Sequence, residues 1–527
     1  MNKNKGFFKV GFFLMFFTLL SKATGFFREQ LLALKFGTSY KADAYVVATT
    51  IPLVIFTCLI IAVTTCFIPV YNKVKLEEGE EEALKFTNNV ITVLTIFSIL
   101  STIFILVFTK PLVRIIASGF TGEVLELSID LVRIMSFMTV FISLSLIYAS
   151  YLQSNEKYAI TAANNIISNL LVMGAFMFSN VIGIKGVAIV ATVGASTQAL
   201  IQYPSMKKLK YRYKFIFNLK DKRFRYMMRL VLPVLIGTAV VQINTLIDRT
   251  LASGLKVGSV SALNYSNKLN LFVFSVVSVA ITTVIFPKLS KLSASNETKK
   301  FEELSFNSLN LIGVITIPIL VFVMFFAEDI VVCLFGYKNF GDSAINMTTS
   351  ALLCYSVGMI FMGYRDVLNK IFYSTGNTKT PMYNSIIATV INIVLNLILV
   401  RFMGHNGLAL ASSISLIITT LILIYKLKNI FNNFKIKDIA KNMSKLLIIS
   451  LVMGIFAIGL KLLFSNILGF KSASLRGMNL GFTFNFLYMG MLFISCVIVY
   501  IGLCYIFKVK EIREIIILLK EKGNSWI

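Results

Sequence analysis

The chain is 527 residues long; 57% of its residues are hydrophobic and only 14% are charged. Its mean hydropathy of +0.81 excludes a soluble globular protein of this size, which must cover its surface with charged side chains. A formal charge of +27 would suggest a nucleic-acid partner in a soluble protein. Here the basic residues gather at the ends of apolar segments, so we predict a membrane protein that binds no nucleic acid.

Apolar segments recur along the whole chain, and each is long enough to cross a bilayer. The first follows Lys3, Lys5 and Lys9 and lacks a small-residue cleavage site, so we interpret it as a retained helix rather than a secretory signal. Since a span needs about 20 apolar residues, the pattern predicts an all-α protein with about fourteen transmembrane helices. The predicted spans are residues 8–35, 40–72, 86–108, 126–152, 158–180, 184–203, 226–252, 259–287, 306–326, 344–374, 382–402, 407–425, 443–464 and 481–507.

Basic residues are unequally distributed between the two sides of these spans. Counted from a cytoplasmic N-terminus, the connections on the cytoplasmic side contain the Lys- and Arg-rich residues 207–225, 288–300, 426–445 and 508–522. Because positive charge is retained in the cytoplasm, we predict that both termini are cytoplasmic.

The spans form two similar sets of six. Residues 62–69 (AVTTCFIP), which end the second span, reappear as residues 280–287 (AITTVIFP) at the end of the eighth. Asn155-Glu156-Lys157 after the fourth span likewise resembles Asn377-Thr378-Lys379 after the tenth. An even number of spans makes the two halves parallel, and such halves commonly rock around a central cavity. We predict an N-terminal six-helix lobe (1–206), a basic cytoplasmic linker (207–225), a C-terminal six-helix lobe (226–428) and two additional helices with a basic tail (429–527).

Several spans contain ionisable residues, which cost about 3 kcal/mol or more in a bilayer and therefore usually face a cavity or a partner. On the first span Lys22 and Glu29 share one face, Arg28 lies at its edge and Gly25 permits a bend. Asp130 and Arg133 are predicted to pair locally and are left out of the site. The candidate substrate-binding residues are Lys22, Arg28, Arg249, Lys268, Arg365 and Lys370, and the candidate charge-pairing or coupling residues are Glu29, Asp43, Asp248 and Asp366.

A cavity with more basic than acidic residues suits an anionic substrate, and a lipid-linked diphosphate is the natural candidate in a membrane. Arg and Lys bind phosphate oxygens through charge-assisted hydrogen bonds. An inside-negative potential would favour outward movement of about two negative charges by roughly 4–5 kcal/mol per 100 mV. We therefore expect no cofactor, with the membrane potential or a coupled sodium ion or proton as the driving force. A cation site of this kind could involve Asp43, Asp248 or Asp366.

Residues that would support catalysis or metal binding are scarce. The six cysteines lie singly in apolar segments, which predicts buried packing residues, and the single histidine, His405, lies in a short turn before Asn406-Gly407. The sequence contains neither GxxxxGK[ST] nor HExxH. We predict that the protein is not an enzyme and has no metal site.

Motifs near the start of the chain carry a resemblance to a known family. Residues 20–29 (LSKATGFFRE) are followed by Phe36-Gly37, by residues 42–45 (ADAY) and by Ile51-Pro52. Through these motifs the chain resembles the MurJ/MviN family of lipid II flippases, which belongs to the multidrug/oligosaccharidyl-lipid/polysaccharide flippase superfamily. Weaker similarity lies in residues 67–69, 248–253, 262–265, 286–287, 372–374 and 378–381.

The resemblance implies that Arg28 and Asp43 are functionally important, that Lys22 stands where the family often has arginine, and that Glu29 stands for its acidic neighbour. The chain departs from the family pattern at Phe56 and Thr57, where basic residues are common. It also lacks the acidic residue that the family often has near position 271.

The expected function is therefore translocation of lipid II, the undecaprenyl-diphosphate-linked peptidoglycan precursor, from the inner to the outer leaflet of the bacterial cytoplasmic membrane by alternating access. Such a protein would serve cell-wall biogenesis and cell shape, and its expected partners are lipid II, membrane lipids and the cell-wall synthesis machinery. The alternative is a flippase for another polyprenyl-diphosphate-linked polysaccharide or teichoic-acid precursor. A drug/cation antiporter is disfavoured because a cationic drug prefers an acidic cavity.

Overall fold

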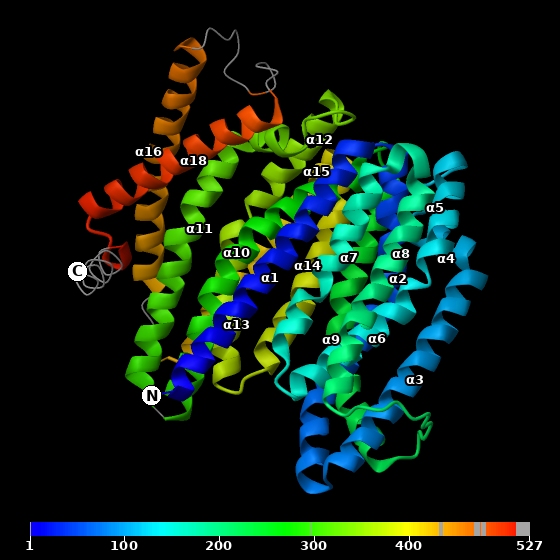
Figure 1. The fold of residues 1–527 in the computed structure, drawn as a ribbon. Coiled ribbons are helices and arrows are strands. Elements are labelled where there is room, and N and C mark those ends of the chain that lie inside the picture. The colour runs from blue at the N-terminus through cyan, green and yellow to red at the C-terminus, as the bar shows by residue number, and fades with distance from the viewer. Residues whose placement is uncertain (1, 296, 432–435, 468–474, 476–480, 513–527) are drawn as a thin grey trace. The chain divides into compact units, whose positions relative to one another are not determined.

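The computed structural model describes residues 2–295, 297–431, 436–467, 475 and 481–512 (Figure 1). These residues form helices joined by short turns, and none of the described residues lies in a strand. The chain divides into two compact units, residues 1–265 and 266–527, and the division falls in the second turn of helix α10. The predicted all-α fold is therefore confirmed.

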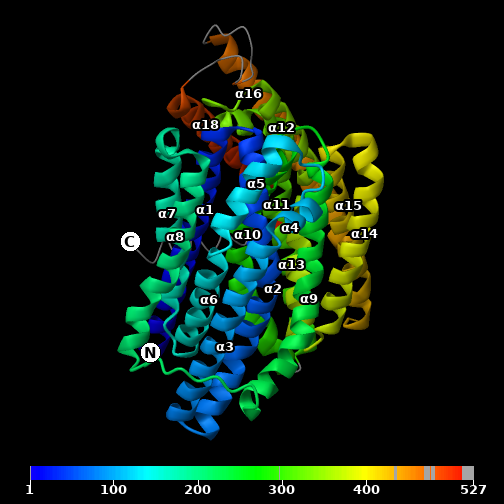
Figure 2. The same ribbon diagram turned by 90° about the vertical axis from the view of Figure 1, so that its right-hand side faces the viewer.

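Unit 1 contains the first nine helices and the start of α10, and Figure 2 shows α3 beside α2 and α6. Its helices are α1 (Asn2–Phe36), α2 (Tyr40–Glu77), α3 (Glu80–Val107), α4 (Thr109–Ile116), α5 (Gly122–Met135), α6 (Met138–Ser154), α7 (Tyr158–Met177), α8 (Ser179–Lys208) and α9 (Lys222–Ser253).

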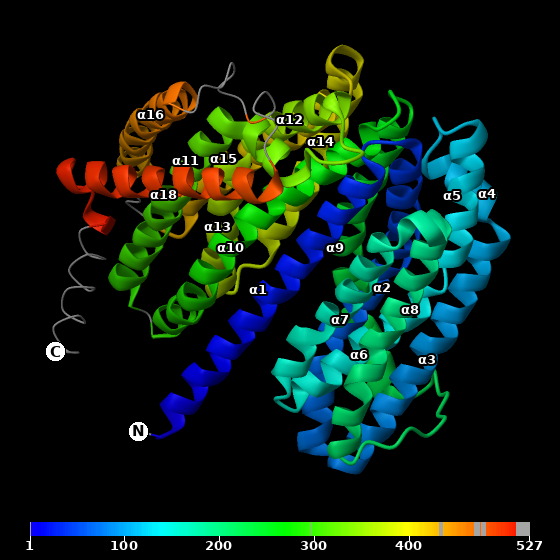
Figure 3. The ribbon, with the colours of Figure 1, turned by 45° about the horizontal axis from the view of Figure 1, so that its top comes forward.

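Unit 2 contains the rest of α10 and the helices that follow it. Its helices are α10 (Ser259–Ala294), α11 (Thr298–Phe335), α12 (Asp342–Ser356), α13 (Met359–Ser374), α14 (Lys379–Met403), α15 (His405–Lys426), the short 3₁₀ helix η1 (Leu427–Asn429), α16 (Ile436–Ile467) and α18 (Phe482–Ile506). Figure 3 shows α18 crossing α11 and α16 at a steep angle, and it packs against both.

The predicted spans all coincide with helices or with bent helix pairs. By length and hydropathy of the described residues, ten helices can cross a membrane, or up to twelve if each bent pair counts as one span. The long helices α1 and α10, of 35 and 36 residues, cover the remaining two predicted spans. A total of fourteen is consistent with this arrangement. At Gly25, where the sequence permits a bend, α1 continues as one helix.

The internal repeat has a structural counterpart in the fourth span of each half. The pair α5 and α6 is bent by 41°, and the pair α12 and α13 is bent by 43°. The same turn ends both pairs: the Lys157 N–H donates to the Leu152 carbonyl at 2.8 Å, and the Asn377 N–H donates to the Phe372 carbonyl at 3.0 Å. In this turn Glu156 (φ 61°) corresponds to Gly376 (φ 75°), so the structural register differs by two residues from the register read in the sequence.

The basic linker after α8 packs along α3 within unit 1. Asn89 exchanges two 2.8 Å hydrogen bonds with the backbone of Asn218, and the Tyr211 hydroxyl donates to Asn88 at 2.7 Å. Burial raises the pKa of Tyr211 above its ordinary value, which keeps this hydroxyl protonated as a donor. The linker is therefore part of unit 1. The lobes predicted from the repeat, 1–206 and 226–428, have other boundaries than the two compact units, and they stay a prediction.

Three further predictions concern single residues. The predicted local pair of Asp130 with Arg133 is wrong, since Asp130 pairs with Lys185 of α8 at 2.6 Å, a partner that only helix packing brings near. The six cysteines are free, and all but the half-buried Cys354 are buried, as predicted. His405 begins α15 directly after the turn at Gly404, and its Nε2 lies 3.1 Å from the Met347 carbonyl oxygen.

Candidate functional site

The charged residues of α1 form a mostly buried ion pair. Arg28 Nη2 lies 2.8 Å from Glu29 Oε1, with 34% of the Arg28 side chain and 11% of the Glu29 side chain exposed. Arg28 Nη1 donates to the Asn169 amide oxygen on α7 at 3.2 Å. Burying two charges is tolerated only where they are paired and hydrogen-bonded, and Arg28 has partners on two helices.

Asn169 is itself held in place by α1. Its amide nitrogen donates to the Thr24 hydroxyl at 3.2 Å and lies 3.4 Å from the Ser21 carbonyl oxygen. Because Gly25 has no side chain, Asn169 approaches this face of α1 closely; a Cβ at Gly25 would lie 3.5 Å from the amide nitrogen. Asn169 therefore orients Arg28 from a second helix.

The polar network continues from Glu29 to α10 and α9. The Asn264 amide donates to Glu29 Oε2 at 3.0 Å, so each carboxylate oxygen of Glu29 has a partner. Arg249 Nη2 donates to the Asn264 amide oxygen at 3.1 Å, and Arg249 Nη1 donates to the Val260 carbonyl at 3.2 Å. Two asparagines thus connect two arginines and one carboxylate across α7, α1, α10 and α9.

Asp43, in the first turn of α2, caps the N-terminus of α10. Its side chain is 2% exposed and accepts hydrogen bonds from the backbone N–H groups of Gly258 at 2.6 Å and Ser261 at 2.8 Å. The first N–H groups of a helix lack partners within the helix and carry a positive partial charge, which a carboxylate satisfies. Asp43 therefore fixes where α10 begins.

Gly258 makes this cap possible. Its φ of +93° is strained for any residue with a side chain, and a Cβ there would lie 2.4 Å from the Thr38 carbonyl oxygen. Nearby, the buried Tyr265 hydroxyl donates to the Gly37 carbonyl at 2.8 Å. The α1–α2 turn and the start of α10 are thus held together by backbone contacts as well as by Asp43.

The remaining candidates lie elsewhere in their units. Lys22 is half-buried on α1, and Asp248 is half-buried on α9 beside Arg249. In unit 2, Lys268 is exposed on α10 and Lys370 lies 5.2 Å from the centre of the Phe286 ring. Arg365 and Asp366 are half-buried neighbours on α13. The side chains of Phe56 and Thr57 lie outside the described residues.

Reading the sequence alone missed the neutral members of the network. Asn264 was part of a recognised motif but had no assigned role, and Asn169 was one of several polar residues in an apolar span. A second buried pair was also missed: Asp329 of α11 accepts from Lys461 of α16 and from the Leu475 backbone N–H. The available signal was an ionisable residue inside an apolar span, which usually has a partner.

The network can hold an anion. The Arg28 guanidinium carries five N–H donors in a planar fork suited to phosphate oxygens, and its side chain is one-third exposed. An incoming phosphate would compete with Glu29 for Arg28, and Asn264 and Asn169 would stay as neutral partners. The exchange would keep Arg28 paired with an anion, whereas Glu29 would give up its cation and keep its hydrogen bond to Asn264.

Comparison with known proteins identifies the family. The family model "Lipid II flippase MurJ" matches residues 32–477. A probable lipid II flippase MurJ of Thermotoga maritima is 28% identical over 501 residues, which is 95% of this chain and 96% of the relative.

Two solved structures share the fold. A lipid II flippase MurJ in an inward closed conformation matches with a TM-score of 0.79 and 26% identity, covering 95% of this chain and 99% of that one. An inward-facing MATE family multidrug resistance transporter of the MOP superfamily matches with a TM-score of 0.68 and 15% identity, covering 79% and 94%. Since the family model covers well over half of the sequence, the chain belongs to the lipid II flippase MurJ family.

Proposed function

We propose that this multi-pass membrane protein translocates lipid II from the inner to the outer leaflet of the bacterial cytoplasmic membrane by alternating access. The observation that carries the proposal is the family match over residues 32–477. Membership of a flippase family also confirms that the protein is a transporter and not an enzyme. The transport of another polyprenyl-linked glycan, the alternative raised by Phe56 and Thr57, becomes an outcome of the experiment below.

Arg28 is proposed as the principal phosphate ligand. Its guanidinium has a carboxylate partner in Glu29, and 34% of its side chain is exposed. In this mechanism the diphosphate displaces Glu29 from Arg28, and Glu29 keeps its bond to Asn264. Departure of the lipid restores the Arg28–Glu29 pair, so the empty transporter never buries an unpaired arginine.

The other charged candidates receive supporting roles. We assign phosphate binding to Lys22 and Arg249 in unit 1 and to Lys268, Arg365 and Lys370 in unit 2. Asp43, Asp248 and Asp366 are proposed to pair with these cations or to couple transport to an ion. For Asp43 the contact with the first turn of α10 suggests a specific means of coupling, because protonation of its carboxylate would weaken the cap of that helix.

The membrane potential is proposed as the driving force, without a cofactor. Outward movement of about two negative charges gains roughly 4–5 kcal/mol per 100 mV when the cytoplasm is negative. The proposed orientation places both termini in the cytoplasm, because the basic connections then lie on the cytoplasmic side. Membrane lipids and the cell-wall synthesis machinery are the proposed partners.

Complementation tests the proposal. The endogenous lipid II flippase of a bacterium is depleted, this chain is expressed, and lipid II on the outer leaflet is measured for the wild type, Arg28→Ala and Arg114→Ala. Arg114 is an exposed arginine on α4 of the same unit, so its variant controls for loss of one positive charge. We expect rescue by the wild type and Arg114→Ala only.

Two results would count against the proposal. Failure of a well-inserted wild type would favour another polyprenyl-linked glycan as the substrate. Full rescue by Arg28→Ala would remove Arg28 from the mechanism while leaving the substrate unchanged.

A further inference from the structure

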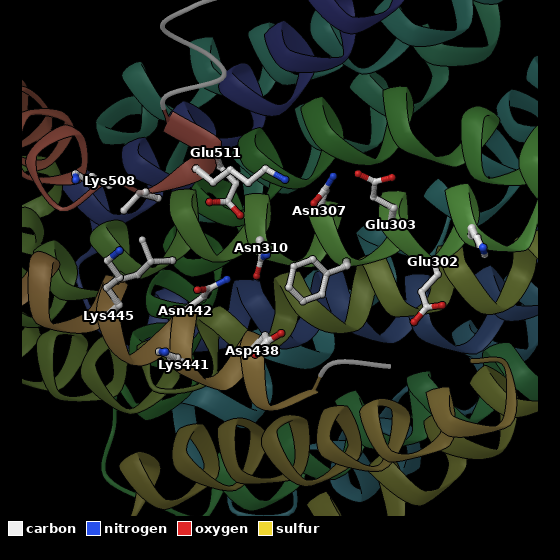
Figure 4. Close-up of a pocket in the computed structure, with 15 residues that line it drawn as sticks. Glu302, Glu303, Asn307, Asn310, Asp438, Lys441, Asn442, Lys445, Lys508 and Glu511 are labelled. Atoms are coloured by element: carbon white, nitrogen blue, oxygen red, sulfur yellow. The ribbon is translucent and has the colours of Figure 1, made fainter. Parts of the chain in front are cut away.

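A cavity of about 950 Å³ lies within unit 2, at the ends of three helices (Figure 4). It is lined by the N-terminal turns of α11, the N-terminal turns of α16 and the residues that follow α18. None of the substrate-binding candidates above lines it. The proposed orientation places this cavity at the cytoplasmic boundary of the membrane.

The lining of this cavity carries a small excess of positive charge. Five lysines and four carboxylates contribute, so the net formal charge is +1 (5 − 4). Figure 4 shows Lys441, Lys445 and Lys508 toward one side of the cavity, and Glu302 and Glu303 toward the other. Within the described part of the chain, none of these three lysines takes part in an ion pair.

The backbone after α18 is shaped to bring Lys508 to this cavity. The Val509 N–H donates to the Cys504 carbonyl at 2.9 Å, and Lys508 adopts a φ of +56°. A left-handed conformation is uncommon for lysine and costs free energy. This turn ends α18 and returns the chain toward α11 and α16.

Asn310 supplies an independent indication of a ligand. Its side chain lines the cavity and is only 3% exposed. Among the described residues no donor lies within hydrogen-bonding distance of its amide oxygen, which is fully buried. Buried polar atoms without partners are rare and costly in native proteins, so this oxygen favours a hydrogen-bond donor other than those of the described residues.

A ligand that combines a phosphate with hydrogen-bond donors would suit both the lysines and Asn310. A phosphate ester satisfies lysines through charge-assisted hydrogen bonds, and one negative charge balances the net charge of the lining. A hydroxyl group satisfies Asn310 and is compatible with the nearby glutamates, which would repel a second anion. A monoanionic phosphodiester that carries free hydroxyls has these properties.

The surroundings favour a membrane lipid over a soluble phosphate ester. In the three turns of α16 that follow Lys445, Ile448 and Ile455 are 62% and 65% exposed. In a transmembrane helix such residues contact acyl chains. A headgroup in the cavity would therefore have its tails beside an apolar helix face.

We propose that this cavity binds the headgroup of a phosphatidylglycerol-type lipid, with the phosphate at Lys441, Lys445 and Lys508 and a glycerol hydroxyl at Asn310. This lipid is a bound partner and not the transported substrate. The proposal does not depend on the proposed transport function, because binding is measured without transport.

Native mass spectrometry of the delipidated full-length protein tests the proposal. The protein is titrated with phosphatidylglycerol, with phosphatidylcholine, which has a phosphate but no hydrogen-bond donor in its headgroup, and with soluble glycerol 3-phosphate. The variants are Lys441→Gln/Lys445→Gln, Asn310→Leu and the control Lys437→Gln, an exposed lysine of α16 outside the cavity. We expect preferential binding of phosphatidylglycerol that weakens about tenfold or more in the first two variants and not in the control.

Other outcomes would overturn the proposal. Equal binding of the two lipids would eliminate the role of the hydroxyl group. Equal weakening in Lys437→Gln would indicate general surface charge in place of a site. Tight binding of glycerol 3-phosphate that displaces the lipid would assign the cavity to a soluble phosphate ester.

Discussion

Replacing Asp43 should weaken unit 1 by an amount that its two backbone hydrogen bonds determine. The carboxylate is 2% exposed and accepts from Gly258 at 2.6 Å and Ser261 at 2.8 Å. A hydrogen bond to a charged group contributes about 1.5–3 kcal/mol. Asp43→Ala should therefore cost about 3–6 kcal/mol, because both donors stay buried without a partner. Asp43→Asn retains one acceptor oxygen and should cost about half as much.

The free cysteines of unit 1 provide the assay. Cys58 and Cys66 lie on α2, the helix that carries Asp43, and both are buried. A thiol-reactive reagent labels them only when the helices separate, so the temperature of half-maximal labelling, read by mass spectrometry at each cysteine, reports the stability of this unit. We expect the order wild type, Asp43→Asn, Asp43→Ala from highest to lowest temperature.

A surface carboxylate provides the control. Asp130 also accepts from one partner, Lys185, but its side chain is 41% exposed, and exposed ion pairs contribute only about 0–1 kcal/mol. Asp130→Asn should label like the wild type. If Asp43→Ala also labelled like the wild type, the cap on α10 would contribute nothing to stability and our reasoning about Asp43 would be refuted.

Three further predictions follow from the buried contacts. Arg28→Lys keeps the charge, but a lysine cannot reach both Glu29 and Asn169. Lipid II exposure in the complementation assay should therefore fall about 10- to 100-fold, the equivalent of one charged hydrogen bond. Unchanged exposure would contradict the two-partner geometry. Gly258→Ala should lower the labelling temperature of unit 1 because of its positive φ and close backbone contact, whereas Gly174→Ala, in open space on α7, should not. Lys461→Met should destabilise unit 2 by about 3–5 kcal/mol, because it leaves the Asp329 carboxylate buried without its cation. The double variant Lys461→Met/Asp329→Asn should recover much of this stability. The labelling temperature of the buried Cys333 measures both effects.

Much of the fold could be predicted from the sequence because a bilayer imposes local rules. Each span must satisfy its own backbone hydrogen bonds, so a long apolar run becomes a helix whatever its neighbours are. The internal repeat could also be read from the residues, and the bends of 41° and 43° in corresponding helix pairs support it. The register of the repeat was off by two residues after the fourth span, because that turn is defined by backbone hydrogen bonds and a positive φ rather than by the identity of its side chains.

The candidate site could be predicted only in part. The position of Arg28 and Glu29 within an apolar span was sufficient to select them, since buried charges need partners. Their neutral partners could not be inferred, because Asn169 is 141 residues from Arg28 and Asn264 is 235 residues from Glu29. Asp43 was selected as a charge, yet its contacts are backbone N–H groups more than 200 residues away, and no side-chain pattern marks such a donor.

The sequence by itself thus determined that this chain crosses the membrane repeatedly, that it has two related halves and that cations lie within its spans, because hydropathy, repetition and charge are properties of short segments. Only the tertiary structure decided which of these charges are paired, through which asparagines, and which helix end Asp43 caps. The physical reason is that a hydrogen bond requires its two atoms within about 3 Å, and in this fold that proximity comes from the packing of helices far apart in the chain.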